Sequence, residues 1–584
     1  MNRKQRRAAS KQSPLPGPGM RLPPAADPVK QLFAEAAQYQ QNNELAAAAR
    51  LYKRLLLLKP DHAEASNNLG VVLLAQGKLS EASARFAQSL ALMPQLFDQF
   101  TAICATLVAL LPPLGEAMRQ ATAAWPNRLP VGQLLGSAGL AAIAADPLLL
   151  FTLQSTPMRD VAIERALTAL RLSLLNGALA GHQVDDTVLA FCCALAQQCF
   201  INEYVFATVP AEDAQVDQLK AALGDALAAG SAIAPMALAA LAMYRPLHAL
   251  SDAQALLDRT WPPAVDDVLT QQLREPLQER ELRAAIPRLT PIEDDVSQRV
   301  RQQYEENPYP RWVHAATANV VLTIDEHLRR QFPSAPFRAL GKDGETDILV
   351  AGCGTGRHPI EVARTYKDAR VLAVDLSLSS LCYAGRKTPA EIADRIDYAQ
   401  ADILKLGSIG RTFDLIDASG VLHHMADPLG AWRTLLALLR PNGFMHLGLY
   451  SEIARRDVVA ARAFIAEHGY RPTADDIRRC RQDLLSSPLN RIARVGDFFS
   501  TSECRDLLFH VQERRMTVPE IKSFIVEQNL QFIGFEFSPQ TLQRYRALFA
   551  DSGWSPTDLD RWHALETQYP DTFSGMYQFW VQKN

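Results

Sequence analysis

A glycine-rich run in the C-terminal half of the chain is the clearest sign of chemistry in the sequence. The apolar run Thr346 to Ala351 is followed at once by Gly352-Cys353-Gly354-Thr355-Gly356 and then by a helical pattern. Glycines allow a sharp turn and keep side chains away from a ligand, and the free N–H groups at a helix start bind polar ligand groups. The spacing predicts a strand, a ligand-binding turn and a helix, with Pro359 in the first helical turn.

Two carboxylates stand at the ends of the next apolar runs. Asp375 closes the run that begins at Arg370 and is followed by Leu376, and Asp402-Ile403 follows the third run. A carboxylate at the end of a strand can accept hydrogen bonds from both hydroxyls of a ribose, and one on the neighbouring strand can reach an adenine amine. The pattern therefore predicts a cofactor that contains a nucleoside.

A histidine pair follows the fourth apolar run. Phe413 to Ser419 leads into Gly420-Val421-Leu422-His423-His424, and Tyr450 ends a fifth run. His424 is the candidate general base for an acceptor that is a hydroxyl or an acidic carbon, with His423 and Tyr450 as alternatives. The competing interpretation is that these histidines are structural. No group of potential ligands has the spacing of a metal site, so no metal is predicted.

An aromatic and proline-rich segment, Tyr304 to Trp312, precedes the glycine run. Its prolines exclude a continuous helix. We expect the segment to cover the ligand pocket as a lid, in which Tyr309 and Trp312 offer aromatic faces to a cationic cofactor. The alternative is that both residues are packing anchors between the sheet and the preceding helices.

The whole run from about 345 to 450 resembles the class I S-adenosylmethionine-dependent methyltransferases. In that family GxGxG, an acidic residue after the second strand, Asp after the third and G-V-L-H-H after the fourth occur in this order, as they do here. The resemblance implies an enzyme that binds S-adenosyl-L-methionine. The implied cofactor site comprises the glycines beside the methionine part, Asp375 on the ribose, Asp402 and Ile403 around the adenine, and the adjoining Cys353, Leu376 and Gly420.

One position departs from the pattern of the family. Many relatives carry an acidic residue two positions before the first glycine, where this chain has Val350. Arg357 or His358 is the expected replacement, through the carboxylate of the methionine part. A nicotinamide dinucleotide is the alternative ligand, but it needs G-x-G-x-x-G, and the third glycine here comes one residue early.

Two further alternating segments complete the expected fold. Leu530 to Phe537 and Met576 to Val581 have the period of strands six and seven. The prediction is a Rossmann-like domain with a seven-stranded sheet over residues 301–584, interrupted by an insertion at about 451–529 that should govern the choice of substrate. The segment Asp497 to Val511 is similar to bacterial tetratricopeptide-repeat-containing methyltransferases, and its Cys504 is expected to be buried rather than nucleophilic.

The N-terminal region repeats itself with a period of 34 residues. Ala48 recurs as Ala82, Tyr52 as Phe86, and Pro60 as Pro94. This period is typical of tetratricopeptide helix pairs, which form an α-solenoid. The prediction is two clear repeats and a degenerate third, from about Phe97, within residues 28–125. Such repeats bind protein partners, dock on their own chain or mediate self-association.

The remaining sequence carries no recognisable chemistry. Residues 126–300 are predicted to be mostly helical, and residues 1–27 are basic and proline-rich, which predicts a disordered tail. The chain of 584 residues is 21% charged and has a net charge of −3. Its eight cysteines include no CxxC pair. We therefore expect a cytoplasmic protein without membrane insertion, and nucleic acid is not an expected partner.

Two functional interpretations remain open. The first is an active methyltransferase whose acceptor is a small molecule or a protein. The second is a catalytically silent scaffold that binds the cofactor while its repeats bind a partner. The absence of an N-P-P-Y-type tetrapeptide after the fourth strand argues against the pocket used for amide or exocyclic base nitrogens.

Overall fold

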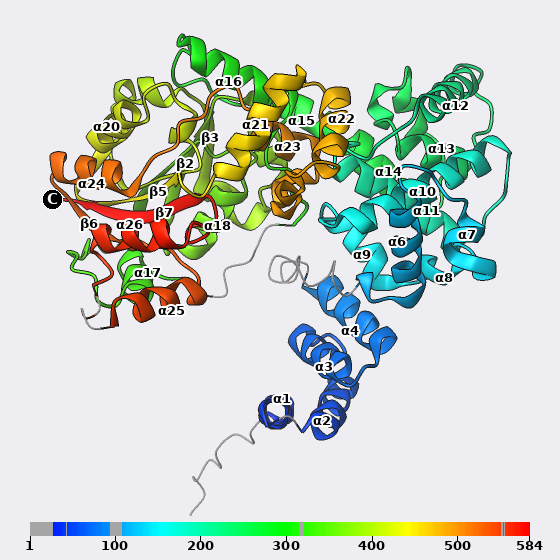
Figure 1. The fold of residues 1–584 in the computed structure, drawn as a ribbon, viewed down its shortest axis with the longest axis horizontal. Coiled ribbons are helices and arrows are strands. Elements are labelled where there is room, and N and C mark those ends of the chain that lie inside the picture. Colours follow the sequence, from blue (N-terminus) through cyan, green and yellow to red (C-terminus); the bar gives the residue numbers. More distant parts are fainter. Residues whose placement is uncertain are drawn as a thin grey trace, which may run out of the picture. The chain divides into compact units, whose positions relative to one another are not determined.

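The computed structural model describes residues 27–42, 44–93, 108–314, 320–342, 344–550, 553 and 555–584 (Figure 1). The chain divides into two compact units, Met1–Met93 and Pro94–Asn584. The predicted disordered tail and the start of the predicted third repeat at Phe97 lie outside the described residues. Within the described residues no helix is both long and apolar enough to cross a membrane.

The first unit consists of two helix pairs, as its 34-residue period predicts. The helices are α1 (Pro28–Gln41), α2 (Leu45–Leu58), α3 (Ala63–Ala75) and α4 (Leu79–Leu92). Ala48 and Ala82 are buried together with the aromatic residues Tyr52 and Phe86. A Cβ atom at Gly70 would lie 2.9 Å from the ring of Phe86, so this glycine is what lets α3 and α4 approach each other.

The second unit begins with the predicted helical region. Two of its helices, α10 (Val161–Leu179) and α11 (Asp186–Ile201), are buried along most of their length. Asp160 and Asp185 cap them by accepting hydrogen bonds from backbone N–H groups of the first turn. The other helices of the region are α6 (Pro112–Ala124), α7 (Val131–Leu135), α8 (Ala141–Ala144), α9 (Pro147–Ser155), α12 (Pro210–Ala228), α13 (Pro235–Ala242), α14 (Pro263–Leu269) and α15 (Glu275–Leu282).

A seven-stranded sheet follows, in the order β3-β2-β1-β4-β5-β7-β6, with β7 antiparallel to both neighbours. The strands are β1 (Thr346–Ala351), β2 (Ala369–Asp375), β3 (Ile396–Gln400), β4 (Phe413–Ser419), β5 (Leu439–Tyr450), β6 (Leu530–Phe535) and β7 (Met576–Lys583). The strands and their number agree with the prediction. One connection differs, because β3 leads to β4 through the short 3-10 segment Ile403–Ile409 rather than a regular helix. The linker is only 12 residues long and contains Gly407 and Gly410.

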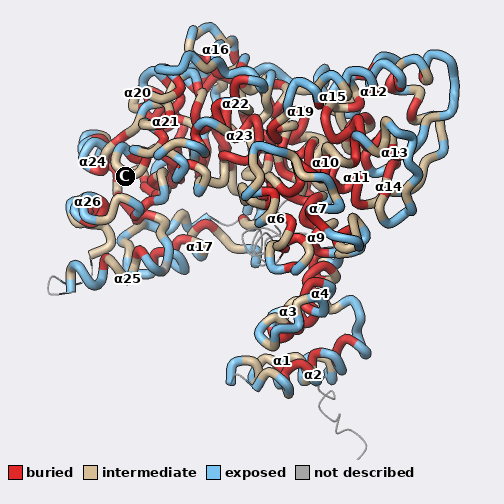
Figure 2. Tube along the Cα trace, turned by 45° about the vertical axis from the view of Figure 1, so that its right-hand side comes forward, coloured by how far each residue is buried: buried red, intermediate tan, exposed pale blue. Residues whose placement is uncertain are grey.

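Side chains that alternate along the strands build one core on each face of the sheet. Ile348 and Val350 face a core shared with α17 (Ile324–Gln331), α18 (Arg357–Thr365) and α19 (Leu378–Lys387). Leu349 and Ala351 face the opposite core, shared with α20 (Pro428–Leu438), α24 (Val518–Glu527) and α26 (Leu559–Gln568). Figure 2 shows the exposed turns on the outer side of α12 and of α16 (Asp295–Glu306). Asp294 caps α16, so the acidic run at 293–295 is a helix start.

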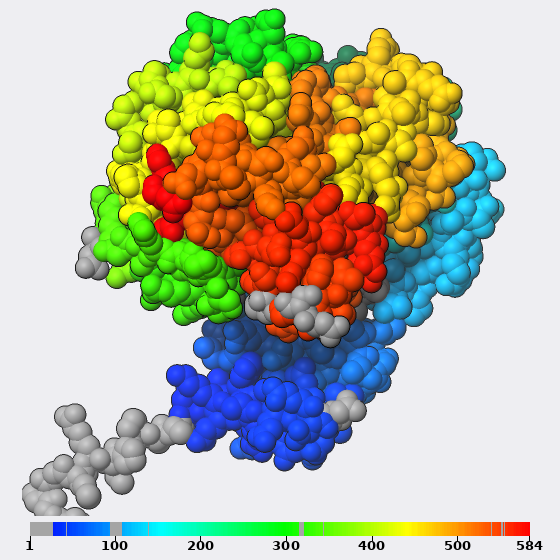
Figure 3. Space-filling model, turned by 60° about the vertical axis from the view of Figure 1, so that its left-hand side comes forward, coloured from blue at the N-terminus to red at the C-terminus, as the bar shows by residue number. Residues whose placement is uncertain are grey.

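The insertion between β5 and β6 packs against the helical region rather than projecting freely (Figure 3). It contains α21 (Arg456–His468), α22 (Ala474–Leu485), α23 (Thr501–Phe509) and α24. Arg481 on α22 donates hydrogen bonds of 3.0 and 2.7 Å to the carboxylate of Glu164 on α10, and both side chains are buried. A buried ion pair must keep both partners in place, so the insertion and the helical region are one structural body.

Candidate active site

A cavity of about 790 Å³ opens at the carboxyl ends of the parallel strands. It lies beside β1 and β4, where the strand order reverses, which is the place where open α/β sheets bind ligands. Its walls come from the glycine run, the ends of β2, β4 and β5, the segment before the sheet and the insertion. Among the predicted site residues, those that border the cavity are Gly352, Cys353, Gly354, Asp375, Leu376, Ile403, Gly420, His424, Tyr309 and Tyr450.

The glycine run fits both the backbone and the neighbouring elements. Gly352, Gly354 and Gly356 all have positive φ angles, which residues with a Cβ rarely adopt. A Cβ on Gly352 would lie 2.5 Å from the side chain of Val421, and one on Gly354 would lie 2.8 Å from the carbonyl oxygen of Tyr309. Larger residues would push the loop out of the cavity wall. Gly356 itself does not border the cavity and packs against Ala384.

Asp375 fits the role of a ribose-binding carboxylate. Its two oxygens accept hydrogen bonds from the backbone N–H groups of Gly354 (2.8 Å) and Ser377 (2.9 Å), which holds the side chain at the cavity wall. Each oxygen retains a lone pair for a ligand hydroxyl. Burial raises the pKa of Asp375, and the backbone donors act against that rise.

Asp402, which is predicted to contact adenine, is not among the residues that border the cavity. The side chain is fully buried behind the cavity wall, where Oδ1 accepts a hydrogen bond of 3.0 Å from the N–H of Leu404. Its neighbours Ala401 and Ile403 border the cavity instead. The structure therefore offers apolar contact to a ligand at this place, and an adenine contact by Asp402 stays a prediction.

The two predicted lid residues of the segment before the sheet, Tyr309 and Trp312, have different positions. Tyr309 borders the cavity, and its carbonyl group lies over Gly354. Trp312 is buried outside the cavity, where its indole N–H lies 3.2 Å from the carbonyl and hydroxyl oxygens of Thr355. Trp312 thus anchors the segment to the glycine run, and Tyr309 is the residue that a ligand can meet.

A cluster of His358, Asp417 and His446 lies at the end of the cavity that the glycine run forms. Asp417 Oδ2 is 2.7 Å from His358 Nε2 and 2.7 Å from His446 Nδ1. Burial alone would lower the pKa of His358, but Asp417 outweighs burial and raises it to about 9. The same two histidines hold the pKa of Asp417 well below its usual range, although burial acts in the opposite direction. His358 is therefore a cation at the cavity wall, and its contact with a ligand carboxylate stays a prediction.

The sequence pattern predicts a ligand contact for His358 but for neither Asp417 nor His446. The three residues come from a helix start and two strands, so no spacing along the chain connects them. The available signal was a polar residue inside each of two apolar runs, Phe413 to Ser419 and Phe444 to Tyr450. Such residues need partners when buried.

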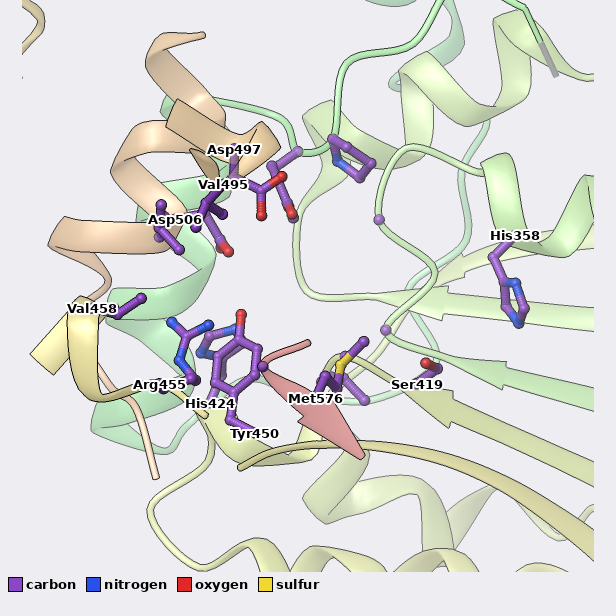
Figure 4. A pocket seen from close by; sticks show the side chains of 18 of the residues that line it. His358, Ser419, His424, Tyr450, Arg455, Val458, Val495, Asp497, Asp506 and Met576 are labelled. Atoms are coloured by element: carbon purple, nitrogen blue, oxygen red, sulfur yellow. The ribbon is translucent and has the colours of Figure 1, made fainter. Parts of the chain in front are cut away.

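The opposite end of the cavity is built around His424 and Tyr450 (Figure 4). The Tyr450 ring stacks on His423, with ring centres 3.5 Å apart, and the guanidinium of Arg455 lies 3.5 Å from its centre on the cavity side. His423 is buried outside the cavity and supports Tyr450 from behind. The His424 ring stacks on His510 at 3.6 Å and is perpendicular to Tyr450.

The hydrogen bonds of this end determine where the histidine protons are. His424 Nδ1 lies 2.9 Å from the carbonyl oxygen of Gln512, so Nδ1 carries the proton and Nε2 keeps its lone pair. His510 Nδ1 accepts a hydrogen bond from the N–H of Gln512 (3.1 Å), so its proton is on Nε2, 3.2 Å from the hydroxyl of Tyr304. Burial lowers the pKa of His424 to about 4, so it is neutral at pH 7.

Two groups of side chains have distances that a metal site could use, and both fail on protonation. His424, Asp506 and His510 each offer an atom within 4.8 Å of the others. A protonated Nε2 on His510 cannot be a metal ligand. In the second group, His358 Nε2 and His446 Nδ1 each lie 2.7 Å from Asp417 Oδ2, and both histidines have raised pKa values, so these two nitrogens carry protons.

Two carboxylates of the insertion complete this end of the cavity. Asp506 on α23 is buried and accepts a hydrogen bond of 2.6 Å from the hydroxyl of Tyr304. Asp497, in the short 3-10 helix Gly496–Phe498 before α23, borders the same cavity. Figure 4 shows both side chains on the side of Tyr450 and His424, away from His358. Burial raises the pKa of each, for Asp506 to about 6. The insertion had been predicted to bear substrate choice, but these two residues had not been singled out.

Comparison with known proteins agrees with the geometry. A methyltransferase domain family matches residues 348–443, and a tetratricopeptide repeat family matches residues 39–107. An uncharacterised protein of Synechococcus is 28% identical over 41% of this chain and 60% of its own length. A ubiquinone biosynthesis O-methyltransferase of Rhizobium rhizogenes is 28% identical over 31% of this chain and 75% of its own. The structure of PKMT2 from Rickettsia typhi with AdoHcy has a TM-score of 0.33 at 14% identity, over 44% of this chain and 51% of that chain.

The matched family, the strand order and the glycine turn at the cavity all point to one class of domain. The match spans 60% of the Synechococcus relative and is confined to part of each chain. The chain therefore combines tetratricopeptide repeats with a class I methyltransferase domain.

Proposed function

We propose that this protein transfers a methyl group from S-adenosyl-L-methionine to an acceptor bound at the His424 and Tyr450 end of the cavity. The observation that carries the proposal is a single cavity with two different ends. One end has a glycine turn, the carboxylate of Asp375 and the cation of His358. The other has an unprotonated imidazole nitrogen. Methyl transfer needs such an arrangement, because it places a nucleophile in line with the methyl group and excludes water.

In this proposal the domain itself supplies binding, orientation and a proton acceptor. Bound S-adenosylmethionine supplies an electrophilic methyl group. Asp375 holds the ribose, and His358 holds the carboxylate of the methionine part. Tyr309 covers the glycine turn from above. His424 accepts a proton at Nε2, because its Nδ1 proton is held by the Gln512 carbonyl and the ring is fixed between His510 and Tyr450.

The acceptor is a small molecule or a protein, and the repeats recruit a protein partner in the cytoplasm. The alternative is a silent scaffold that binds the cofactor without transferring its methyl group. The open Nε2 of His424 favours activity, since a scaffold has no use for a buried imidazole held in one tautomer at a cavity wall.

Labelled cofactor separates the two functions. The full chain is incubated with methyl-labelled S-adenosylmethionine and a cell extract, and the label is then followed into small-molecule and macromolecular fractions. An active enzyme moves label into one fraction, and His424→Gln lowers the rate about 100- to 10,000-fold without weakening cofactor binding. Tight binding of S-adenosylhomocysteine with no transfer into any fraction would establish the scaffold instead.

A further inference from the structure

The acceptor end of the cavity carries negative charge that the protein does not neutralise. Arg455 donates hydrogen bonds of 3.1 and 2.9 Å to Glu513, and Arg159 pairs with Glu503 at 3.1 Å. Asp497 makes no hydrogen bond or ion pair with any residue that the structure describes. Asp506 accepts a single hydrogen bond from a side chain, and its donor is the neutral hydroxyl of Tyr304. Arg455, which is buried, and Arg159, which is exposed, are therefore committed to other carboxylates.

Other cations near the cavity do not change this balance. Arg462 also approaches Glu513, at 3.6 Å, so it reinforces a carboxylate that is already paired. Arg456, Arg491 and Arg494 border the cavity, but all three are exposed, and water screens their charges. Three cations, Arg159, Arg455 and Arg462, thus stand near four carboxylates, Glu503, Glu513, Asp497 and Asp506. The carboxylates outnumber the cations, and burial together with Asp497 raises the pKa of Glu503 to about 7, while burial raises the pKa of Asp506 to about 6.

The surroundings of the two unpaired carboxylates favour an organic cation. Tyr304 and Tyr309 stack with ring centres 6.4 Å apart, and both border the cavity. Aromatic faces attract ammonium groups through the quadrupole of the ring. The open Nε2 of His424, on a residue only 6% exposed, is a second unpartnered group at the same place, and it is an acceptor of hydrogen bonds. Carboxylates, aromatic faces and a lone pair all select a donor with positive charge.

We propose that the methyl acceptor is the nitrogen of an amine, which enters as an ammonium ion held between Asp497 and Asp506. The inference rests on the proposed methyltransferase function and adds its substrate class. A hydroxyl acceptor would leave both carboxylates without a counter-ion, and a carboxylate acceptor would add a third negative charge to them.

The step balances with groups at the site and water. One N–H proton of the ammonium passes by way of His424 Nε2 to water, because an imidazole with a pKa of about 4 does not keep it at pH 7. The freed nitrogen lone pair attacks the methyl carbon of the sulfonium. The new N–C bond forms as the C–S bond breaks, and its electron pair stays on sulfur, which leaves as a neutral thioether. The product is again an ammonium and remains held by Asp497 and Asp506. The positive charge lost by sulfur reappears on the product nitrogen, so the transfer from sulfonium to neutral amine leaves the total charge of the cavity unchanged.

Three ring compounds of similar shape provide a binding test. Benzylamine, benzyl alcohol and benzoate are titrated into the full chain saturated with S-adenosylhomocysteine. We expect benzylamine to bind about tenfold tighter than the other two, and Asp497→Asn to weaken benzylamine about ten- to a hundredfold, because a charge-assisted hydrogen bond is lost. Benzyl alcohol should bind the variant and the parent within about twofold. Equal affinity for the three compounds, or benzylamine binding that Asp497→Asn leaves unchanged, would overturn the inference.

Two matched variants serve as controls for this binding test. Asp457→Asn makes the same change in charge at the half-buried edge of the cavity and should leave benzylamine affinity within about twofold. Asp506→Asn provides an independent loss if Asp497→Asn fails to fold, which the affinity for S-adenosylhomocysteine reports in the same titration. A chain that does not bind S-adenosylhomocysteine refutes the proposed function itself. Label from the extract experiment found on oxygen refutes only the amine, and label found on nitrogen supports it.

Discussion

The two ends of the cavity contain the same types of residue in opposite states. At the cofactor end, Asp417 lies 2.7 Å from both His358 and His446, and the pKa of His358 rises to about 9. At the acceptor end, His424 stacks on His510 with Asp506 nearby, and the pKa of His424 falls to about 4. All these groups except His358 are buried. The difference teaches that direct contact with an ionised carboxylate, rather than burial, decides whether a histidine here is a cation.

Asp417→Asn should have the largest effect on the free energy of unfolding. The substitution leaves two histidines without their counter-ion, and we expect a loss of about 3 to 5 kcal/mol in the free energy of unfolding. Asp506→Asn is the matched control, because an amide can still accept the hydrogen bond from Tyr304, and we expect a loss of about 1 kcal/mol or less. Urea unfolding followed by tryptophan fluorescence measures both. Equal losses would show that the two clusters do not differ in charge.

The pH dependence of stability should have opposite signs at the two ends. The folded pKa of His358 is above its unfolded value of about 6.5, so its contribution is fully present below pH 6.5 and is lost as pH rises through about 9. The folded pKa of His424 is below the unfolded value, so its contribution is present above pH 6.5 and is lost as pH falls towards about 4.

Differences in unfolding free energy between the parent and either His358→Gln or His424→Gln, measured from pH 4 to pH 10, isolate the two contributions. For His424, which is buried, the change should reach about 3 kcal/mol. Two curves with the same sign would contradict the assigned protonation states.

Asp375→Ala, at the cofactor end of the cavity, should weaken cofactor binding. The loss of paired hydrogen bonds to the ribose should raise the Kd for S-adenosylhomocysteine about ten- to a hundredfold, as calorimetry would show. Asp497→Asn, at the acceptor end, should leave that Kd within about twofold. An unchanged Kd in a folded Asp375→Ala variant would remove this residue from the cofactor site.

Removal of residues 1–93 should have the smallest effect. The helix pairs of the first unit bury their surface against each other, so the Kd for S-adenosylhomocysteine should change less than about twofold. A cut at residue 290 is the contrasting control, because it takes Glu164 away from Arg481 and exposes an apolar surface, and residues 290–584 alone should be poorly soluble. Loss of cofactor binding after removal of only the repeats would place them in the active site.

The pattern of residues along the chain was enough to predict the helix pairs and the sheet of this protein. The 34-residue period specified the helix pairs, because small residues and aromatics recur where two helices must touch. The order of apolar runs, glycines and acidic residues specified the sheet and brought Gly352, Asp375 and His424 to one edge, because parallel strands end on the same side. Short-range hydrogen bonding and periodicity act within a few residues, so they can be read along the chain.

The protonation states and the acceptor end depended on the tertiary structure. Asp417 meets His358 and His446 from three separate elements, and Asp497 and Asp506 face His424 only because the insertion folds back onto the cavity. The same folding joins Arg481 to Glu164, 317 positions away in sequence. A pKa depends on which charges lie within a few ångströms and how much water remains, and neither quantity is written in the spacing of residues. The sequence by itself therefore determined the cofactor class and the elements that hold it, and the tertiary structure decided the charge of each end of the cavity.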